Sequence, residues 1–326
     1  MSNTISENRI RVVTLGELLI DFTSVSVDSD GYPTLSAHPG GAPANFLGTL
    51  AKLGVKTAMT GKVGDDTFGH LLVNTLASLG VDTSNLIKDK SVFTTLAFVT
   101  LDNNGNRDFA FSRKPGADTQ ISFDEIDLSL IDECDIFHFG SLSLTDDPSR
   151  TATYKTVEYA KNKGKIISFD PNLRRPLWNN LNEAKKQILW GLENADIVKI
   201  SDDEVAFLFG INPADGAEYI INNFGAKLVF VTCGENGCYY ANRNGKGYTP
   251  AMKDINVIDT TGAGDIFAGS MIYGVLESGK KPEDLSFDEL VKIAESGVRF
   301  AGLSTQKYGG ISSIPDKKEF FKEVLC

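Results

Sequence analysis

Cysteine and long apolar runs are both scarce in this 326-residue chain. Its four cysteines are too few and too scattered for a disulfide framework: Cys134, Cys233, Cys238 and Cys326. No second cluster of cysteine or histidine accompanies Cys233 and Cys238 to complete a metal site, so we expect buried, neutral thiols. No apolar stretch approaches the ~20 residues that cross a bilayer, and the polar N-terminus lacks a signal-peptide run. These absences predict a cytoplasmic protein with no membrane partner.

The chain also lacks an excess of basic residues. Lys and Arg number 32 against 43 Asp and Glu, which gives a net charge of −11. That balance argues against nucleic acid as the main partner, although a local basic pocket for a phosphate-bearing ligand remains compatible with it. Hydrophobic residues make up 41% of the chain and charged residues 23%. This composition is globular, and the length is sufficient for a sizeable core.

Apolar runs alternate with helical stretches along the chain. We expect a strand at 10–22, helices at 43–53 and 66–79, a short strand at 57–59, and further strands at 135–139, 165–169, 196–200 and 228–232. Such alternation is typical of an α/β fold, in which helices cover both faces of a mostly parallel sheet. Sheets of this kind bind ligands at the carboxyl ends of their strands.

Two segments break this alternation. Residues 23–38 are polar and rich in turn-forming residues, and residues 92–111 read as two strands around the turn signal at 102–106. Neither segment is followed by a helix. They form either a small β flap inserted into the α/β body or a decorated edge of the main sheet, and the pattern alone does not separate the two.

The strongest chemical signal is the sequence DTTGAGD at 259–265, which runs directly into an apolar helix. Glycine lets a backbone approach a ligand closely, and the free N–H groups of a helix N-terminus point at an anion. Asp265 adds a carboxylate beside that anion site. A capping role would account for Asp265 alone, but not for the three small residues Gly262, Ala263 and Gly264 between two aspartates.

A second glycine loop, GGAPAN at 40–45, also enters a helix. Gly40 and Gly41 permit close backbone approach, and Asn45 offers both a donor and an acceptor, as a sugar requires. The alternative is an ordinary strand-to-helix turn with a proline at the helix start. A near match to a nucleotide phosphate loop at 274–281 lacks the final Ser or Thr, so we expect Gly279 to end a helix there.

These two glycine motifs, in this order and near opposite ends of the chain, resemble those of the PfkB (ribokinase-like) carbohydrate kinases. The resemblance covers residues 16–315. Segments 16–22, 61–66, 137–141 and 170–178 are similar to fructokinases, whereas 111–118 matches less closely because Ser112, Lys114 and Gly116 replace the usual neighbours. The resemblance implies one kinase domain over 1–326: a three-layer α/β/α body with a mostly parallel sheet, plus a β-sheet lid from about 23–38 and 92–117. It also implies a homodimer formed through the lid.

The activity that the resemblance implies is phosphoryl transfer from ATP to a sugar hydroxyl, turning fructose into fructose 6-phosphate. Asp265 would accept the hydroxyl proton, and the N–H groups of Gly262, Ala263 and Gly264 would stabilise the charge on the transferred group. The residues implied to hold the sugar are Asp21, Gly40, Gly41 and Asn45. Arg113 and Arg174 are candidates for contacts to sugar or phosphates, with a surface salt bridge as the alternative for each.

The resemblance also implies a nucleotide site and two cation sites. The nucleotide site comprises Ser201, Thr232, Gly234, Gly237, Gly264 and Val298. Many relatives have Asn where this chain has Val298, so we expect apolar contact with the adenine. Glu204 would organise magnesium waters, unless it is a solvated helix carboxylate. A potassium loop would comprise Asp259, Thr261, Ser304, Lys307, Gly309 and Ser313.

Two other functions remain open at this point. The catalytic loop handles phosphate and not the sugar, so a kinase for another small sugar, a sugar acid such as 2-keto-3-deoxygluconate, or a riboside would carry the same loop. A non-catalytic sugar sensor is the second alternative. The intact Asp265 argues against the sensor.

Overall fold

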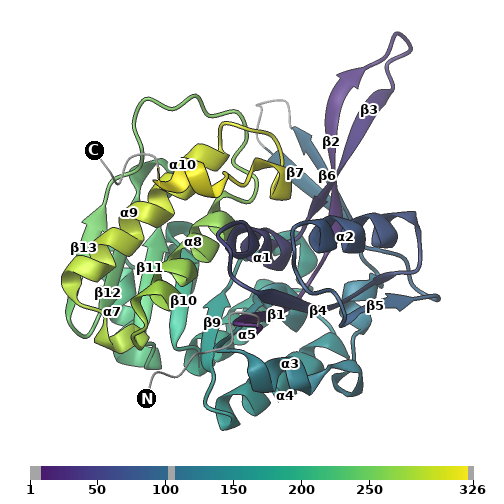
Figure 1. The fold of residues 1–326 in the computed structure, drawn as a ribbon. Helices are drawn as coiled ribbons and strands as arrows, with labels where there is room; N and C mark the ends of the chain where they lie inside the picture. The colour runs from purple at the N-terminus through teal and green to yellow at the C-terminus, as the bar shows by residue number, and fades with distance from the viewer. Residues whose placement is uncertain (1–8, 102–106, 322–326) are drawn as a thin grey trace.

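The computed structural model describes residues 9–101 and 107–321, which form two β-sheets and the helices around them (Figure 1). The larger sheet has nine strands in the order β13-β12-β11-β10-β9-β8-β1-β4-β5. The strands from β11 to β5 are parallel, and β12 and β13 are antiparallel at one edge. Their bounds are β1 Val12–Leu15, β4 Thr57–Gly64, β5 Leu86–Asp89, β8 Ile136–Gly140, β9 Ile166–Asp170, β10 Ile197–Ser201, β11 Leu228–Thr232, β12 Cys238–Asn242 and β13 Gly245–Thr249. The predicted mostly parallel sheet is confirmed.

Helices cover both faces of this sheet. One face packs against α1 (Ala42–Lys52), α2 (Thr67–Ser78), α8 (Ala263–Ser278) and α9 (Phe287–Ser304). The other packs against α3 (Leu128–Glu133), α4 (Ser149–Asn162), α5 (Leu181–Asn194), α6 (Asp202–Phe209) and α7 (Pro213–Phe224). Successive side chains of a strand point to opposite faces, so Val12 of β1 joins the first core and Val13 the second. The predicted three-layer α/β/α body is confirmed.

The smaller sheet has four strands in the order β3-β2-β6-β7. They are β2 (Leu19–Val27), β3 (Pro33–Gly40), β6 (Leu96–Leu101) and β7 (Arg107–Ser112). Segments 23–38 and 92–111 therefore belong to one separate sheet, which agrees with the β flap and not with the decorated edge of the main sheet. The expected turn at 102–106 lies outside the described residues. Figure 1 shows β2 and β3 continuing as an arm that projects from the body.

The prediction of one strand over 10–22 is wrong, because β1 and β2 lie in different sheets. The chain turns at Gly16, where a Cβ would approach Pro43 Cγ to 2.6 Å. The sequence does not reveal the break because Leu18 is as buried as the strands on either side of it. The strand predicted at 57–59 extends to Gly64 as β4.

The predicted helices at 43–53 and 66–79 are confirmed within a residue as α1 and α2. Gly279 ends α8 with a left-handed φ of 64°, as predicted. Cys134, Cys233 and Cys238 are buried free thiols, and burial raises the pKa of each; Cys326 lies outside the described residues. None of the helices between residues 9 and 321 combines the length and the apolar character that a bilayer crossing needs.

Candidate active site

The loop before α8 forms the centre of the candidate site. Gly262 has a φ of 76°, a left-handed conformation that favours glycine, and the helix starts at Ala263. A Cβ on Gly262 would lie 2.9 Å from the Cα of Gly310, so this loop packs directly against the C-terminal loop at Gly310. The N–H of Ala263 also donates to the backbone oxygen of Thr260 at 3.3 Å. The N-terminus of α8 is therefore held in one place, in an arrangement that suits an anion.

Asp265 lies in the first turn of α8 and is buried. Its Oδ2 accepts a hydrogen bond of 2.8 Å from Nδ2 of Asn45, in the first turn of α1. The two predicted glycine motifs thus meet in space. Burial raises the pKa of Asp265 above its ordinary value, although the Asn45 hydrogen bond and the charges of Lys199 and Arg174 act in the opposite direction. Its carboxylate is consequently more basic than that of an exposed aspartate.

Asp21 on β2 shares the electrostatic environment of Asp265. Burial raises the pKa of Asp21 to about 6; the Arg174 charge lowers it, while the carboxylates of Asp265 and Asp259 raise it. On the neighbouring strand β3, a Cβ on Gly40 would clash with the Asp21 carboxylate, so glycine makes room for it there. The structure therefore brings Asp21 and Arg174, two of the residues predicted to bind sugar, close to Asp265.

Gly41 and Glu17 pack against each other in the loop that was predicted to bind the sugar. Gly41 has a φ of 112°, and a Cβ there would lie 2.6 Å from the backbone oxygen of Glu17. The Glu17 carboxylate accepts a 3.0 Å hydrogen bond from the N–H of Ala42 at the start of α1. Burial raises the pKa of Glu17 to about 7. Glu17 was not among the residues expected from the sequence, because a glutamate after a short strand usually indicates an exposed turn.

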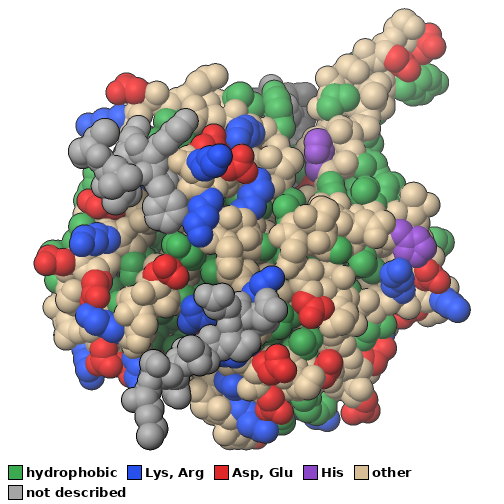
Figure 2. All heavy atoms as spheres, viewed as in Figure 1, with side chains coloured by type: hydrophobic (Ala, Val, Ile, Leu, Met, Phe, Trp, Pro, Cys, Tyr) green, Lys and Arg blue, Asp and Glu red, His purple; other side chains and the backbone are tan. Residues whose placement is uncertain are grey.

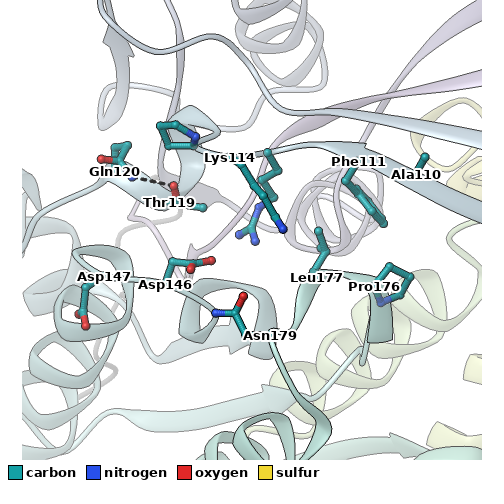
Figure 3. A pocket seen from close by; sticks show the side chains of 12 residues that line it. Ala110, Phe111, Lys114, Thr119, Gln120, Asp146, Asp147, Pro176, Leu177 and Asn179 are labelled. Carbon is teal, nitrogen blue, oxygen red and sulfur yellow. Dashed lines mark hydrogen bonds between the residues drawn. The ribbon is translucent and has the colours of Figure 1, made fainter.

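Arg113 is not in a surface salt bridge. Its side chain is 2% exposed and pairs with Asp118 at 2.6 Å, and it donates further hydrogen bonds to Thr145 Oγ1 and to the backbone oxygen of Leu142. Arg113 also lines a cavity of about 450 Å³. Figure 3 shows Phe111 and Lys114 on one side of this cavity, and Asp146, Leu177 and Asn179 on the other.

Glu204 is not the solvated helix carboxylate given as its alternative, because it is only 7% exposed. Its Oε1 accepts the N–H of Leu173 at 2.7 Å, and its Oε2 accepts the N–H of Ser201 at 2.8 Å. Ser201 and Glu204 form a capping box at the start of α6, which explains their spacing.

The predicted nucleotide residues lie on neighbouring elements. Ser201 and Thr232 end the adjacent strands β10 and β11. Gly234 and Gly237, both with positive φ, bound the turn between β11 and β12. Val298 is on α9 and packs against the core on the same face of the sheet as α8.

The residues predicted to form a potassium loop are partly brought together. Asp259 accepts hydrogen bonds from Thr261 N at 2.9 Å and from Gly309 N at 2.8 Å. The hydroxyls of Ser304 and Ser313 donate to backbone oxygens within three residues of each. The Lys307 ammonium lies 3.9 Å from the Glu319 carboxylate, so only the backbone oxygen of Lys307 suits a cation.

A buried lysine, Lys199, was missed by the sequence analysis. It is in the apolar strand β10 and lies 3.1 Å from the Asp170 carboxylate, beneath the loop of Gly264. The sequence feature that could have indicated it is a single charged residue inside an apolar strand, because a buried lysine nearly always has a charged partner.

Comparison with known proteins agrees with this geometry. The model of the pfkB family of carbohydrate kinases matches residues 9–317. A probable fructokinase-2 of Arabidopsis thaliana is 40% identical over 321 residues, which are 97% of this chain and 96% of that protein. The fructokinase of Xylella fastidiosa, solved with bound ATP, superposes with a TM-score of 0.88 at 28% identity, over 96% of this chain and 98% of that one.

A double mutant of the fructokinase of Vibrio cholerae O395, solved in a fructose-, ADP- and potassium-bound form, superposes with a TM-score of 0.84 at 29% identity. The match covers 97% of this chain and 98% of that one. The family match spans nearly the whole chain and includes both glycine loops and Asp265. This protein belongs to the pfkB family of carbohydrate kinases.

Proposed function

We propose that this protein is an ATP-dependent fructokinase that converts D-fructose into fructose 6-phosphate. The observation that carries the proposal is the hydrogen bond between Asn45 and Asp265, which joins the sugar-binding loop to the loop that suits an anion. The similarity to plant fructokinases over the full chain length supports fructose as the acceptor.

In this mechanism Asp265 takes the proton of the C6 hydroxyl as that oxygen bonds to the γ-phosphorus of ATP. The bond from the γ-phosphorus to the β,γ-bridging oxygen breaks, and ADP leaves with the electron pair. The N–H groups of Gly262, Ala263 and Gly264 face the charge on the transferred phosphoryl group. Asp21, Gly40, Gly41, Asn45 and Arg174 hold the sugar.

Arg113 serves the same sugar site less directly. Its hydrogen bonds to Asp118, Thr145 and Leu142 already fix its guanidinium. We assign it to the wall of the sugar site, where it also borders the cavity beside Phe111.

Magnesium would accompany ATP in this reaction, neutralising phosphate charge. A buried carboxylate whose oxygens each accept one backbone N–H retains lone pairs for water, and carboxylates and waters are the ligands that Mg²⁺ prefers. Glu204 meets this description. We assign it to the waters of the magnesium ion.

Potassium fits the loop of Asp259. Carboxylate, carbonyl and hydroxyl oxygens suit a hard cation, and Thr261 and Gly309 both lie within hydrogen-bond distance of the Asp259 carboxylate. The potassium-bound form of the Vibrio cholerae relative supports this assignment. We propose that a bound potassium ion orders the adjacent loop at Gly262.

We further propose that the small sheet is a lid over the sugar and that two lids pair in a homodimer. The arm of β2 and β3 exposes Val25, Val27 and Tyr32 at 60%, 64% and 68%, and Figure 2 shows apolar side chains along it. An exposed apolar surface of this kind favours a partner. A second copy fits because its arm offers the same apolar side chains in return.

A substrate panel tests the proposed function. Purified protein is mixed with MgATP and, separately, with fructose, other hexoses, 2-keto-3-deoxygluconate and ribosides, and ADP production is measured. We expect turnover with fructose and fructose 6-phosphate as product. Turnover only with another acceptor would move the assignment to that sugar, and no turnover with any acceptor would favour the sensor.

A further inference from the structure

Lys199 is a buried cation next to the anion-binding loop. It is 7% exposed and lies two residues after Ile197, on the sheet face that α8 covers. The β9–β10 register pairs Val198 with Phe169, which places Lys199 beside Asp170 at the carboxyl ends of both strands. The Lys199 Nζ lies 3.1 and 3.4 Å from the two oxygens of Asp170.

The same ammonium group lies beside the first turn of α8. A Cβ on Gly264 would lie only 2.9 Å from Lys199 Nζ, so the absence of a side chain at Gly264 makes room for the ammonium. Gly264 is one of the three residues whose N–H groups are assigned to the transferred phosphoryl group. The ammonium therefore lies beside this anion-binding loop.

The charge of Lys199 is retained despite burial. Burial favours the neutral amine, but the carboxylates of Asp170, Glu204 and Asp265 outweigh it and raise the pKa of Lys199 above its ordinary value. An ammonium group has three N–H donors, and within the described part of the chain its hydrogen bonds go only to Asp170. The Lys199 ammonium therefore still has an N–H donor for a hydrogen bond to an anion.

Stability alone does not account for this pair. A buried ion pair costs desolvation and is often replaceable by apolar side chains without loss of stability. Lysine is, however, a compact point charge well suited to phosphate. A fixed cation at the site of developing charge lowers a phosphoryl-transfer barrier.

We propose that Lys199 is a further catalytic residue, whose ammonium donates a hydrogen bond to an oxygen of the phosphoryl group in transfer while Asp170 holds it in place. This inference rests on the proposed kinase function. Lys199 keeps its proton throughout, and no bond to it forms or breaks. Its contribution is the stabilisation of negative charge on the equatorial oxygens.

Paired variants separate this role from a structural one. Lys199→Met removes the positive charge and leaves the Asp170 carboxylate unpaired in the core. Asp170→Asn combined with Lys199→Met removes both charges, so no unpaired buried charge destabilises the double variant. Lys62→Met is the matched control, because Lys62 is an equally buried lysine that pairs with Glu125 instead. For each variant we would measure Tm, kcat and KM with ATP and the preferred acceptor of the panel.

A second readout does not depend on turnover. Aluminium fluoride bound with ADP and the acceptor imitates the transferring phosphoryl group. Titration calorimetry compares the affinity for ADP in the presence of aluminium fluoride and the acceptor with the affinity for ADP alone. We expect kcat to fall by about 10²–10³-fold in Lys199→Met and in the double variant. Both proteins should also fail to form the tight aluminium fluoride complex, while their affinity for ADP alone stays nearly unchanged. We expect Lys62→Met to lower Tm without these losses.

The inference is overturned if the double variant folds and either recovers a kcat near that of wild type or keeps the tight aluminium fluoride complex. Failure of the proposed function is distinguishable, because it appears in the wild type as absence of turnover with fructose. If the wild type uses another acceptor, the same variants are measured with that acceptor. Absence of phosphoryl transfer to every acceptor would overturn both proposals.

Discussion

The side-chain amide of Asn45 donates a 2.8 Å hydrogen bond to the carboxylate of Asp265, across 220 residues of sequence. Both side chains are buried where α1 packs against α8. The oxygen of the same amide, Asn45 Oδ1, has no hydrogen-bond partner in the described part of the chain. A buried amide oxygen without a partner costs free energy, and a sugar hydroxyl would satisfy it. This placement supports the proposal that Asn45 orients Asp265 as the base and also binds the sugar.

Asn45→Ala should impair sugar binding and catalysis together. We expect the KM for fructose to rise and kcat to fall, with the KM for ATP little changed. The Asn45 hydrogen bond lowers the pKa of Asp265, so its removal raises that pKa further. Because the base must be ionised, the loss of kcat on the acid side should begin at a higher pH in the variant. Steady-state kinetics between pH 5 and 9 measure both effects; an acid limb that does not move would contradict the role of Asn45 toward Asp265.

Glu17→Gln should change how stability depends on pH. The pKa of Glu17 is raised from 4.5 to about 7 by burial, so between these pH values the folded protein binds more protons than the unfolded chain. The free energy of unfolding of the wild type therefore falls as pH rises through this window. Glutamine resembles the protonated acid and has no such dependence.

We expect the stability of Glu17→Gln relative to wild type to increase from pH 5 to pH 8, by on the order of 1–3 kcal/mol. Urea titrations at the two pH values measure this difference. A relative stability that stays constant across the window would show that Glu17 ionises in its ordinary range.

Potassium should raise kcat. We expect several-fold higher turnover in potassium chloride than in tetramethylammonium chloride at equal ionic strength, because a cation at Asp259 orders the loop at Gly262. Asp259→Ala should reduce the difference between the two salts. Equal wild-type rates in both salts would argue against a cation site.

Val25→Glu combined with Val27→Glu should separate the proposed homodimer. Glutamate charges on the exposed arm would have to be desolvated at the proposed lid interface, which is unfavourable. Leu181→Glu is the control and should leave the association state unchanged, because Leu181 is 38% exposed at the start of α5, away from the arm. Sedimentation velocity measures the association state. A monomeric wild type, or arm variants that remain dimeric, would refute the lid interface.

Local pattern was sufficient to predict much of the fold. Alternating apolar runs predicted the parallel strands, and caps such as Asp66 and Gly279 bounded the helices. The break between β1 and β2 was not predictable, because Leu18 continues the apolar run through a turn between two sheets. Periodicity reports burial and does not report which sheet a strand joins.

The site was predictable where glycine and aspartate form a local motif, as at 259–265. It was not predictable where charge is placed by tertiary structure. The surroundings of Lys199 are Asp170 on the neighbouring strand and Gly264 on α8, and the carboxylate of Glu17 accepts the N–H of Ala42. None of these partners is adjacent in sequence.

The turnover of Asp265→Asn with fructose and MgATP tests the central claim most directly. Asparagine keeps the size of the side chain and removes the basic oxygen, and loss of a general base costs about 10²–10⁴-fold in rate. We predict a kcat lower by at least that order, with unchanged Tm and nearly unchanged affinities for ADP and fructose. A folded Asp265→Asn protein with near-normal kcat would contradict Asp265 as the base.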